Sequence, residues 1–271
     1  MPWLQLVAAD SRAQIVDMTG MTPDQVSAIR HIAGNLQLIA CAGSGKTEVV
    51  PRRVVNLLRP KGDGGAGCSP DNIIAFTFTD KAAAELNDRI HTRCREQLGD
   101  VTGLAEMYVG TIHGFCLDLL KTEVPKYMKY EVLNEVQQVL FIDRHSKASG
   151  LTESTTGNGK PLKRYTDTGN YPSAMAILRE DNPADLSKLA GNSVVAGLAK
   201  YEQLLHSKGY LDYSGILKEA MEELRQNKSL RRRLAQRVKH VIVDEYQDVN
   251  PVQEAVVVIA VTFMTPSCAE E

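Results

Sequence analysis

A glycine-rich segment near the N-terminal end of the chain has the residue types and spacing that hold a phosphate chain. Its members are Ala42, Gly43, Ser44, Gly45, Lys46 and Thr47. Glycines let backbone N–H groups turn inward around phosphate oxygens, and a helix that begins near Gly45 would point the positive end of its dipole at them. In this pattern Lys46 reaches the β- and γ-phosphates, and the Thr47 hydroxyl binds Mg²⁺. The segment predicts a nucleoside triphosphate site, although Ala40 replaces the usual first glycine of the pattern.

Two adjacent carboxylates, Asp244 and Glu245, follow the apolar residues 241–243. A carboxylate at the end of a strand can hold Mg²⁺, and its neighbour can orient or deprotonate an attacking water. Most adjacent acidic pairs are solvated surface charges, so the pair alone is a weak signal. The apolar strand before it and the phosphate-binding segment upstream favour a catalytic role.

The elements that must position these residues follow from the hydrophobic pattern. Short apolar runs predict strands at residues 36–40, 72–79, 108–111 and 241–243. Helices are expected at residues 25–32 with Thr22 as N-cap, at 45–58 and at 81–95. Strands that alternate with helices imply right-handed crossovers and a parallel sheet.

The stretch from about residue 113 to 239 lacks convincing strands. Apolar residues recur at helical spacing in 132–142, 194–205 and 216–224. We therefore predict a helical subdomain inserted into the α/β domain. The basic run at residues 228–239 could touch DNA, but a solvated helix face is the favoured interpretation.

Composition limits the classes of partner. The 271 residues can bury a full core, and a net charge of −2 gives no global attraction to nucleic acid or anionic membranes. Any DNA binding must therefore come from a local patch. The five cysteines form no C-x-x-C pair, which argues against a zinc or iron–sulfur site. We find no signal peptide and no apolar run of membrane-spanning length, so we expect a cytoplasmic protein without a membrane partner.

The segment Asp244-Glu245-Tyr246-Gln247-Asp248 resembles motif II of the UvrD/Rep/PcrA group of superfamily 1 DNA helicases. Three further segments agree in the right order: residues 21–25 are similar to the Q motif, 76–85 to motif Ia and 109–114 to motif Ib. Residues 209–213 are similar to the place where the family's chain re-enters its first RecA-like domain.

The resemblance implies a P-loop NTPase of RecA-like type, with a parallel sheet flanked by helices and an inserted helical subdomain. The expected domains are residues 1–118 and 212–271 for the two parts of the RecA-like domain, and 119–211 for the inserted subdomain. The expected cofactors are ATP and Mg²⁺. The implied activity is ATP hydrolysis coupled to single-stranded DNA translocation and unwinding, 3′ to 5′.

The resemblance also assigns residue roles. Lys46, Glu245 and Gln247 are the expected catalytic residues, with Gln247 coupling the nucleotide to a neighbouring domain. Gln25 would read the adenine edge, and Thr47 and Asp244 would hold the metal. The expected DNA contacts are Phe78, Thr79, Thr111 and His113. Two alternatives stay open here, because strand alternation could bury Phe78 in the core and His113 could simply begin a helix.

Departures from the family pattern affect the expected activity. Glu48 stands where several members carry Arg, Asp80 where many carry Asn, and Pro51 lies early in the phosphate-loop helix. The family's later motifs do not follow motif II in this sequence. The arginines that complete the family's ATP site belong to the missing second domain, so this sequence lacks them as well. We therefore expect nucleotide binding with slow hydrolysis by the chain alone.

The expected partners are single-stranded DNA or DNA junctions, and a second chain that supplies the missing RecA-like domain. The alternative function is a non-catalytic fragment that binds nucleotide and single-stranded DNA. A helicase module and a non-catalytic fragment would share every motif found in this sequence. Only the second RecA-like domain would distinguish them.

Overall fold

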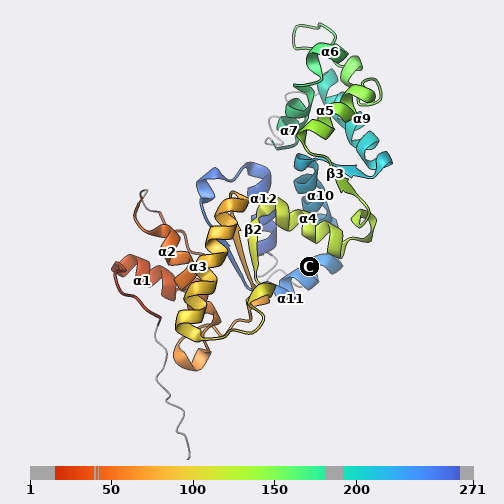
Figure 1. The fold of residues 1–271 in the computed structure, drawn as a ribbon. Helices are drawn as coiled ribbons and strands as arrows, with labels where there is room; N and C mark the ends of the chain where they lie inside the picture. Colours follow the sequence, from red (N-terminus) through yellow and green to blue (C-terminus); the bar gives the residue numbers. More distant parts are fainter. Residues whose placement is uncertain (1–15, 40, 42, 181–191, 263–271) are drawn as a thin grey trace, which may run out of the picture. The chain divides into compact units, whose positions relative to one another are not determined.

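The computed structural model describes residues 16–39, 41, 43–180 and 192–262. The chain groups into two compact units, each of which is drawn in Figure 1. The first unit contains the chain up to Val109 together with Val238–Asp244. The second contains Gly110–Arg237 together with the chain from Glu245 onward. No helix of the described part of the chain is long and apolar enough to cross a membrane.

A three-stranded sheet forms the centre of the first unit, and the last two residues of one strand, Gly110 and Thr111, belong to the second unit. Its strands are β1 (Ile73–Thr77), β2 (Tyr108–Thr111) and β5 (His240–Val243), in the order β2-β1-β5. β1 and β5 run parallel, with Ile73 opposite His240 and Phe76 opposite Val243. All five residues of β1 are buried, as expected for a central parallel strand covered on both faces. The predicted fold class, an α/β protein with a parallel sheet, is confirmed.

Three helices of the first unit accompany the sheet: α1 (Pro23–Arg30), α2 (Lys46–Leu58) and α3 (Asp80–Leu98). α1 begins with Pro23 at its first position and a capping box in which the Thr22 hydroxyl accepts from the Gln25 N–H. The predicted cap at Thr22 is therefore confirmed. α3 begins after Thr79, whose hydroxyl accepts from the Ala82 N–H at 3.1 Å. Short 3₁₀ turns occur at Lys61–Asp63, Pro70–Asn72 and Leu104–Glu106.

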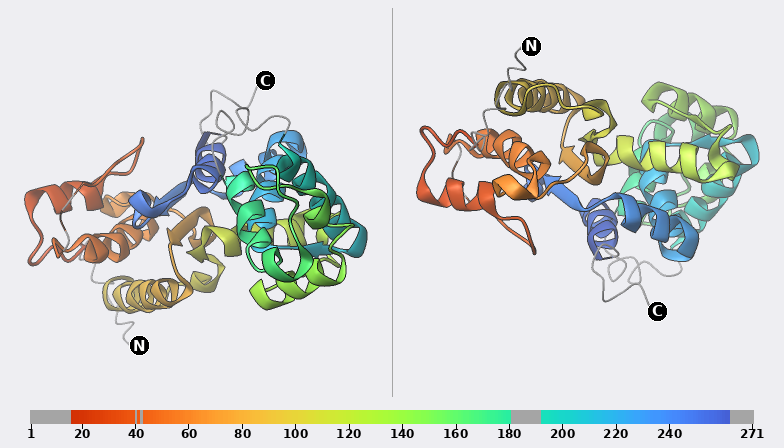
Figure 2. Two further views of the ribbon diagram at one scale, coloured as in Figure 1. Left: turned by 90° about the horizontal axis from the view of Figure 1, so that it is seen from above. Right: turned by 90° about the horizontal axis from the view of Figure 1, so that it is seen from below.

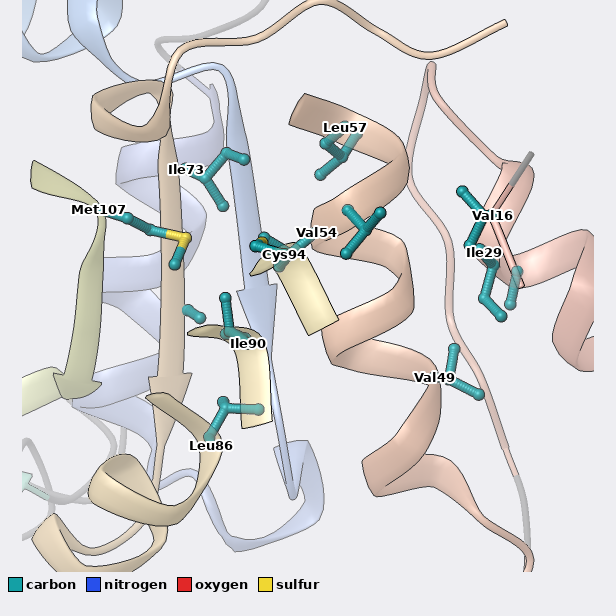
Figure 3. Packing of buried hydrophobic residues seen from close by; sticks show 13 residues of the cluster. Val16, Ile29, Val49, Val54, Leu57, Ile73, Leu86, Ile90, Cys94 and Met107 are labelled. Atoms are coloured by element: carbon teal, nitrogen blue, oxygen red, sulfur yellow. The ribbon is translucent and has the colours of Figure 1, made fainter. Parts of the chain in front are cut away.

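Apolar side chains from these helices and from β1 form one core in the first unit (Figure 3). Leu86, Ile90 and Cys94 recur at helical spacing along α3 and are almost completely buried. Val54 and Leu57 contribute from α2 and are fully buried, and Ile73 contributes from β1. Burial raises the pKa of the Cys94 thiol to about 11, so this cysteine acts as an apolar core residue.

The second unit is helical. Its longer helices are α4 (Ile112–Glu123), α5 (Glu135–Arg144), α7 (Tyr171–Glu180), α9 (Ser193–Lys208), α10 (Tyr213–Gln226), α11 (Lys228–Arg237) and α12 (Pro251–Thr262). Shorter elements are α6 (Arg164–Asp167) and 3₁₀ turns at Pro125–Tyr127, Leu151–Glu153 and Tyr246–Asp248. In both views of Figure 2 the green and teal helices α5, α7 and α9 gather into one cluster. The buried core of this cluster includes Ile142, Met175 and Tyr201.

A buried polar network ties this cluster to the chain at Asp212. Arg179 Nη1 donates to Asp212 Oδ1 at 2.6 Å, and Arg179 Nε donates to Glu202 Oε1 at 3.0 Å. Asp212 also caps α10 by accepting the Gly215 N–H at 2.9 Å. The Arg179 and Asp212 side chains are only 3% and 1% exposed, so each charge compensates for the loss of water around the other.

Two sequence predictions about strands are wrong. Residues 36–39 form no strand, and Leu36 and Ile39 are 45% and 85% exposed. An apolar run indicates that residues can be buried, whereas a strand also needs a backbone partner, and none is found for residues 36–39 in the part of the chain that the structure describes. The second unit contains two short strands that the pattern did not reveal, β3 (Glu131–Val132) and β4 (Tyr210–Leu211), which pair in parallel. At two residues each they are too short to produce a periodic signal.

We predict that Ile90→Ala destabilises the first unit, because Ile90 is 0% exposed in the core beneath α3. The loss of buried methyl groups and the cavity left behind should lower the free energy of unfolding by roughly 2–5 kcal/mol. Urea denaturation monitored by circular dichroism measures this change. Arg89→Ala, an exposed position on the same helix, is the matched control and should change the unfolding free energy little. Equal effects of both substitutions would contradict the assigned core.

Candidate nucleotide site and DNA-contacting segments

The phosphate-binding segment opens α2 in the conformation that its glycines permit. Gly43 and Gly45 adopt φ angles of 77° and 81°, in the left-handed region that glycine enters without steric cost. Gly45 is the N-cap of α2, and no side chain caps the helix there. The N–H groups of the first turn of α2 are therefore not bound by a capping side chain, as anion binding requires. Lys46 and Thr47 form the first two residues of this helix, and Ala42 lies outside the described residues.

Gln25 connects the beginning of α1 to the phosphate-binding segment. Its Nε2 donates to the Ser44 carbonyl oxygen at 2.7 Å, and its Oε1 accepts the Thr22 N–H at 2.8 Å. A primary amide has two donor hydrogens and two acceptor lone pairs. One donor and one acceptor position of Gln25 therefore remain for a ligand beside the loop.

The unusual Glu48 is neutralised within the first unit. Its Oε1 accepts from Arg52 Nε at 3.0 Å and from Arg93 Nη2 at 2.6 Å. Arg52 is 5% exposed and also pairs with the Asp17 carboxylate at 3.5 Å. Two arginines thus offset the negative charge of the Glu48 side chain. Pro51 lies buried inside α2, and the helix continues past it to Leu58.

Asp244 follows the last residue of β5 and is anchored by its backbone. Its N–H donates to the Phe76 carbonyl oxygen at 2.9 Å, which extends the parallel β1–β5 ladder by one bond. This bond fixes the direction in which the chain leaves the sheet. A carboxylate and a hydroxyl such as Thr47 are hard oxygen donors, which suit Mg²⁺ when nucleotide phosphates complete its coordination.

Glu245 has a strained backbone. Its φ and ψ angles of 53° and 45° make it a left-handed residue that is not glycine, and it caps the 3₁₀ turn Tyr246–Asp248. The Gln247 side-chain amide donates to the Glu245 carboxylate, and the Tyr246 hydroxyl donates to Glu254 Oε1 at 2.7 Å. A left-handed non-glycine residue costs about 1–2 kcal/mol, and such outliers concentrate at functional sites.

Phe78 is the exposed aromatic residue at the end of β1. The strand ends at Thr77, so Phe78 escapes the alternation that buries Phe76, and 58% of its surface is exposed. Phe76 is 1% exposed and packs edge-on against Tyr108 at 6.1 Å between ring centroids. The interpretation of Phe78 as a core residue is therefore wrong. Thr79 is exposed beside it and caps α3, with the acidic Asp80 in the first turn of the helix.

Thr111 and His113 begin α4 in the second unit. The Thr111 hydroxyl caps α4 by accepting the Gly114 N–H at 3.1 Å. His113 is 8% exposed and stacks on Tyr213, with ring centroids 3.8 Å apart and planes 16° apart. Burial lowers the pKa of the imidazole to about 4, so the ring is neutral near pH 7. A DNA contact by His113 stays a prediction; in the structure the ring packs within its unit.

Hydrogen bonds that the sequence did not predict connect the segment after motif II to His113. Asn250 and Gln253 form a capping box at the start of α12, with bonds of 2.8 and 3.0 Å between them. The Gln253 Nε2 also lies 3.5 Å from His113 Nδ1, and Asn250 Nδ2 donates to Glu180 Oε2 at 3.0 Å. The N-x-x-Q spacing at residues 250–253 is a capping signal that could have revealed the start of this helix.

A parallel sheet, a glycine-rich loop that opens a helix and a carboxylate after a strand define the class of P-loop nucleotide-binding proteins. Comparison with known families narrows this class. The UvrD/REP helicase N-terminal domain family matches residues 21–264, so the chain belongs to that family. The resemblance drawn from the motifs is thereby confirmed.

Several curated relatives show the same likeness. The chain is 29% identical over 253 residues to ATP-dependent DNA helicase UvrD1 of Mycobacterium leprae, a match that covers 89% of this chain and 30% of that protein. It is 28% identical over 243 residues to ATP-dependent DNA helicase PcrA of Bacillus subtilis, covering 87% of this chain and 30% of that protein. For ATP-dependent DNA helicase Rep of Buchnera aphidicola the identity is 28%, with 84% and 32% covered. The chain thus spans about 30% of the length of the relatives it matches.

We predict that His113 makes stability depend on pH. Because its pKa is lowered to about 4, the unfolded state binds the proton first as pH falls from about 6.5, and the free energy of unfolding falls with it. Between pH 7 and about pH 4.5, protonation linked to His113 should lower the free energy of unfolding by roughly 2 kcal/mol. The His113→Gln variant should lack this part of the pH dependence. Urea titrations at both pH values measure the difference. His91→Gln in the first unit is the control, and identical pH profiles for wild type and His113→Gln would refute the prediction.

Proposed function

We propose that this chain is the nucleotide-binding module of a UvrD-like DNA helicase and that it binds ATP with Mg²⁺. The observation that carries the proposal is the start of α2, where Gly43 and Gly45 adopt left-handed angles and no side chain caps the helix. A phosphate chain is the ligand that such a helix start accommodates. The three relatives described above are each named ATP-dependent DNA helicases, which supports the same nucleotide.

In this proposal the loop and motif II divide the work of binding the nucleotide and activating water. The Lys46 ammonium binds the outer phosphates, while Thr47 and Asp244 would hold Mg²⁺, whose charge offsets that of the phosphates. Glu245 orients or deprotonates the attacking water, and Gln247, which holds the Glu245 carboxylate by a hydrogen bond, positions it. The backbone turns at Gly43 and Gly45 would let N–H groups of the loop complete the phosphate cradle.

Gln25 is proposed to read the adenine base. After its bonds to Ser44 and Thr22, the amide keeps one donor hydrogen and one acceptor lone pair. Adenine presents N7 as an acceptor and its N6 amino group as a donor, which is the complementary pair. The existing bond to Ser44 then holds the base-reading amide beside the phosphate loop.

We propose that Phe78, Thr79, Thr111 and His113 contact single-stranded DNA. The support is clearest for Phe78, whose exposed ring offers a face for base stacking without sequence preference. DNA-stimulated ATP hydrolysis, translocation and 3′ to 5′ unwinding are proposed for the complete helicase. This activity would also need a second RecA-like domain, which a second chain could supply. The division into residues 1–118, 119–211 and 212–271 is proposed as the domain plan.

The nucleotide assignment predicts different effects for two substitutions. Lys46→Ala should abolish detectable binding of a fluorescent ATP analogue, because it removes the charge that meets the phosphates. Glu245→Gln should preserve binding and lower any hydrolysis by about 10²–10⁴-fold, since a general base is lost while the shape is kept. Lys61→Ala, an exposed lysine after α2, is the control for the lost charge. Unchanged binding in Lys46→Ala would overturn the site. Binding without any hydrolysis in the wild type would favour the non-catalytic alternative.

The DNA assignment predicts that Phe78→Ala weakens binding of an oligothymidylate. The loss should be roughly 1–3 kcal/mol, which is the contribution of one stacked base. Fluorescence anisotropy at fixed ionic strength measures it. Tyr165→Ala removes another exposed aromatic ring, 87% exposed in the second unit, and should leave the affinity unchanged. Equal affinities for wild type and Phe78→Ala would remove Phe78 from the proposed contacts.

A further inference from the structure

Glu48 places a carboxylate in the first turn of α2, at the end of the helix where the proposed nucleotide site needs positive potential. The residue follows Lys46 and Thr47 directly, and its N–H donates to the Gly45 carbonyl oxygen at 3.0 Å. Side chains of a helix lean toward its N-terminal end, so this carboxylate leans toward the place where phosphate would bind. A negative charge there stabilises the helix but opposes the binding of another anion.

Two arginines meet this carboxylate within the first unit. Glu48 Oε1 accepts from Arg52 Nε at 3.0 Å, one turn further along α2, and from Arg93 Nη2 of α3 at 2.6 Å. Both are hydrogen bonds between charged groups, which are stronger than bonds between neutral ones. The Glu48 side chain is 29% exposed, so water screens only part of its charge. The two arginines offset the remainder.

Arg52 is shared with a second carboxylate. Besides Glu48, it pairs with the Asp17 carboxylate at 3.5 Å and donates to the Asp17 carbonyl oxygen. One guanidinium thus faces two carboxylates, so Arg52 alone leaves negative charge beside the start of α2. Arg93 supplies the second positive charge. Its other carboxylate partner, Glu96 at 3.1 Å, is 52% exposed and therefore well solvated.

We propose that Arg93 is a positioning residue of the nucleotide site, which holds the Glu48 carboxylate against α3 and offsets its charge so that phosphates can bind at the start of α2. The inference rests on the proposed function, because it concerns the affinity of the same site for a nucleoside triphosphate. Arg93 acts on the ligand only through Glu48. Without Arg93, the carboxylate would reduce the positive potential at the start of α2, and the affinity for an anion would fall although the phosphate loop is intact.

The test is a charge cycle at the two positions, measured as the affinity of the whole chain for fluorescent ATP and ADP analogues at low ionic strength. Arg93→Gln should weaken binding of the ATP analogue roughly three- to tenfold, and binding of the less charged ADP analogue by a smaller factor. Glu48→Gln alone should bind at least as tightly as the wild type. The double variant Glu48→Gln with Arg93→Gln should recover most of the loss, because the carboxylate that Arg93 offsets is gone.

Further measurements separate this role from a structural one. Arg93→Lys keeps the positive charge and should retain most of the affinity. A higher KCl concentration should reduce the defect of Arg93→Gln, because salt screens charge repulsion but does not repair a displaced helix. Arg95→Gln removes an exposed arginine from the same helix and is the matched control, which should bind like the wild type. The melting temperature of each variant shows that the fold is retained.

Three results would overturn the inference: wild-type affinity in Arg93→Gln, no recovery in the double variant, or an equal loss in Arg95→Gln. If the wild type binds the ATP analogue and Lys46→Ala abolishes that binding, any of these results removes only the role of Arg93. If the wild type binds neither nucleotide, the proposed function fails, and this inference fails with it.

Discussion

The parallel pairing of β1 with β5 is the interaction on which the candidate nucleotide site of the first unit depends. Strands that run parallel end at the same edge of a sheet, so the segments that follow them leave from neighbouring points. The bond from the Asp244 N–H to the Phe76 carbonyl oxygen is the last step of this ladder. The exposed ring of Phe78 lies just after β1, and the carboxylate of Asp244 lies just after β5. The four residue pairs that align β1 with β5 bring residues more than 160 positions apart in the chain to one edge of the sheet.

Local chemistry made the first unit predictable in large part. Thr22 with Gln25 encoded the start of α1, and the unbroken apolar run at residues 73–77 encoded a buried strand. Phe78 was harder, because alternation applies only while the strand lasts, and the chain turns into the cap of α3 directly after Thr77. The burial of His113 could not be foreseen, since it depends on Tyr213, one hundred positions away. A contact between residues so far apart in the chain produces no periodic pattern in the sequence.

The segment after motif II shows how packing overrides local preference. Residues 255–261 are uncharged and rich in β-branched valine and isoleucine, which favour strands when considered alone. In the structure they belong to α12, with Val256 and Val257 buried and Val258 half-exposed. The capping box of Asn250 and Gln253 fixes where this helix begins, and burial of one face then stabilises it.

The left-handed backbone of Glu245 has a consequence for which residues the position can hold. Glycine, and to a lesser extent asparagine or aspartate, would occupy this angle at lower cost, whereas a β-branched side chain would be excluded. Backbone geometry therefore selects against glutamate rather than for it. A library of substitutions scored only for folding should rank glycine above the native residue, and one scored for turnover should reverse that order. If Glu245 has the proposed role, the first ranking measures the requirement of folding at this position and the second measures the requirement of hydrolysis.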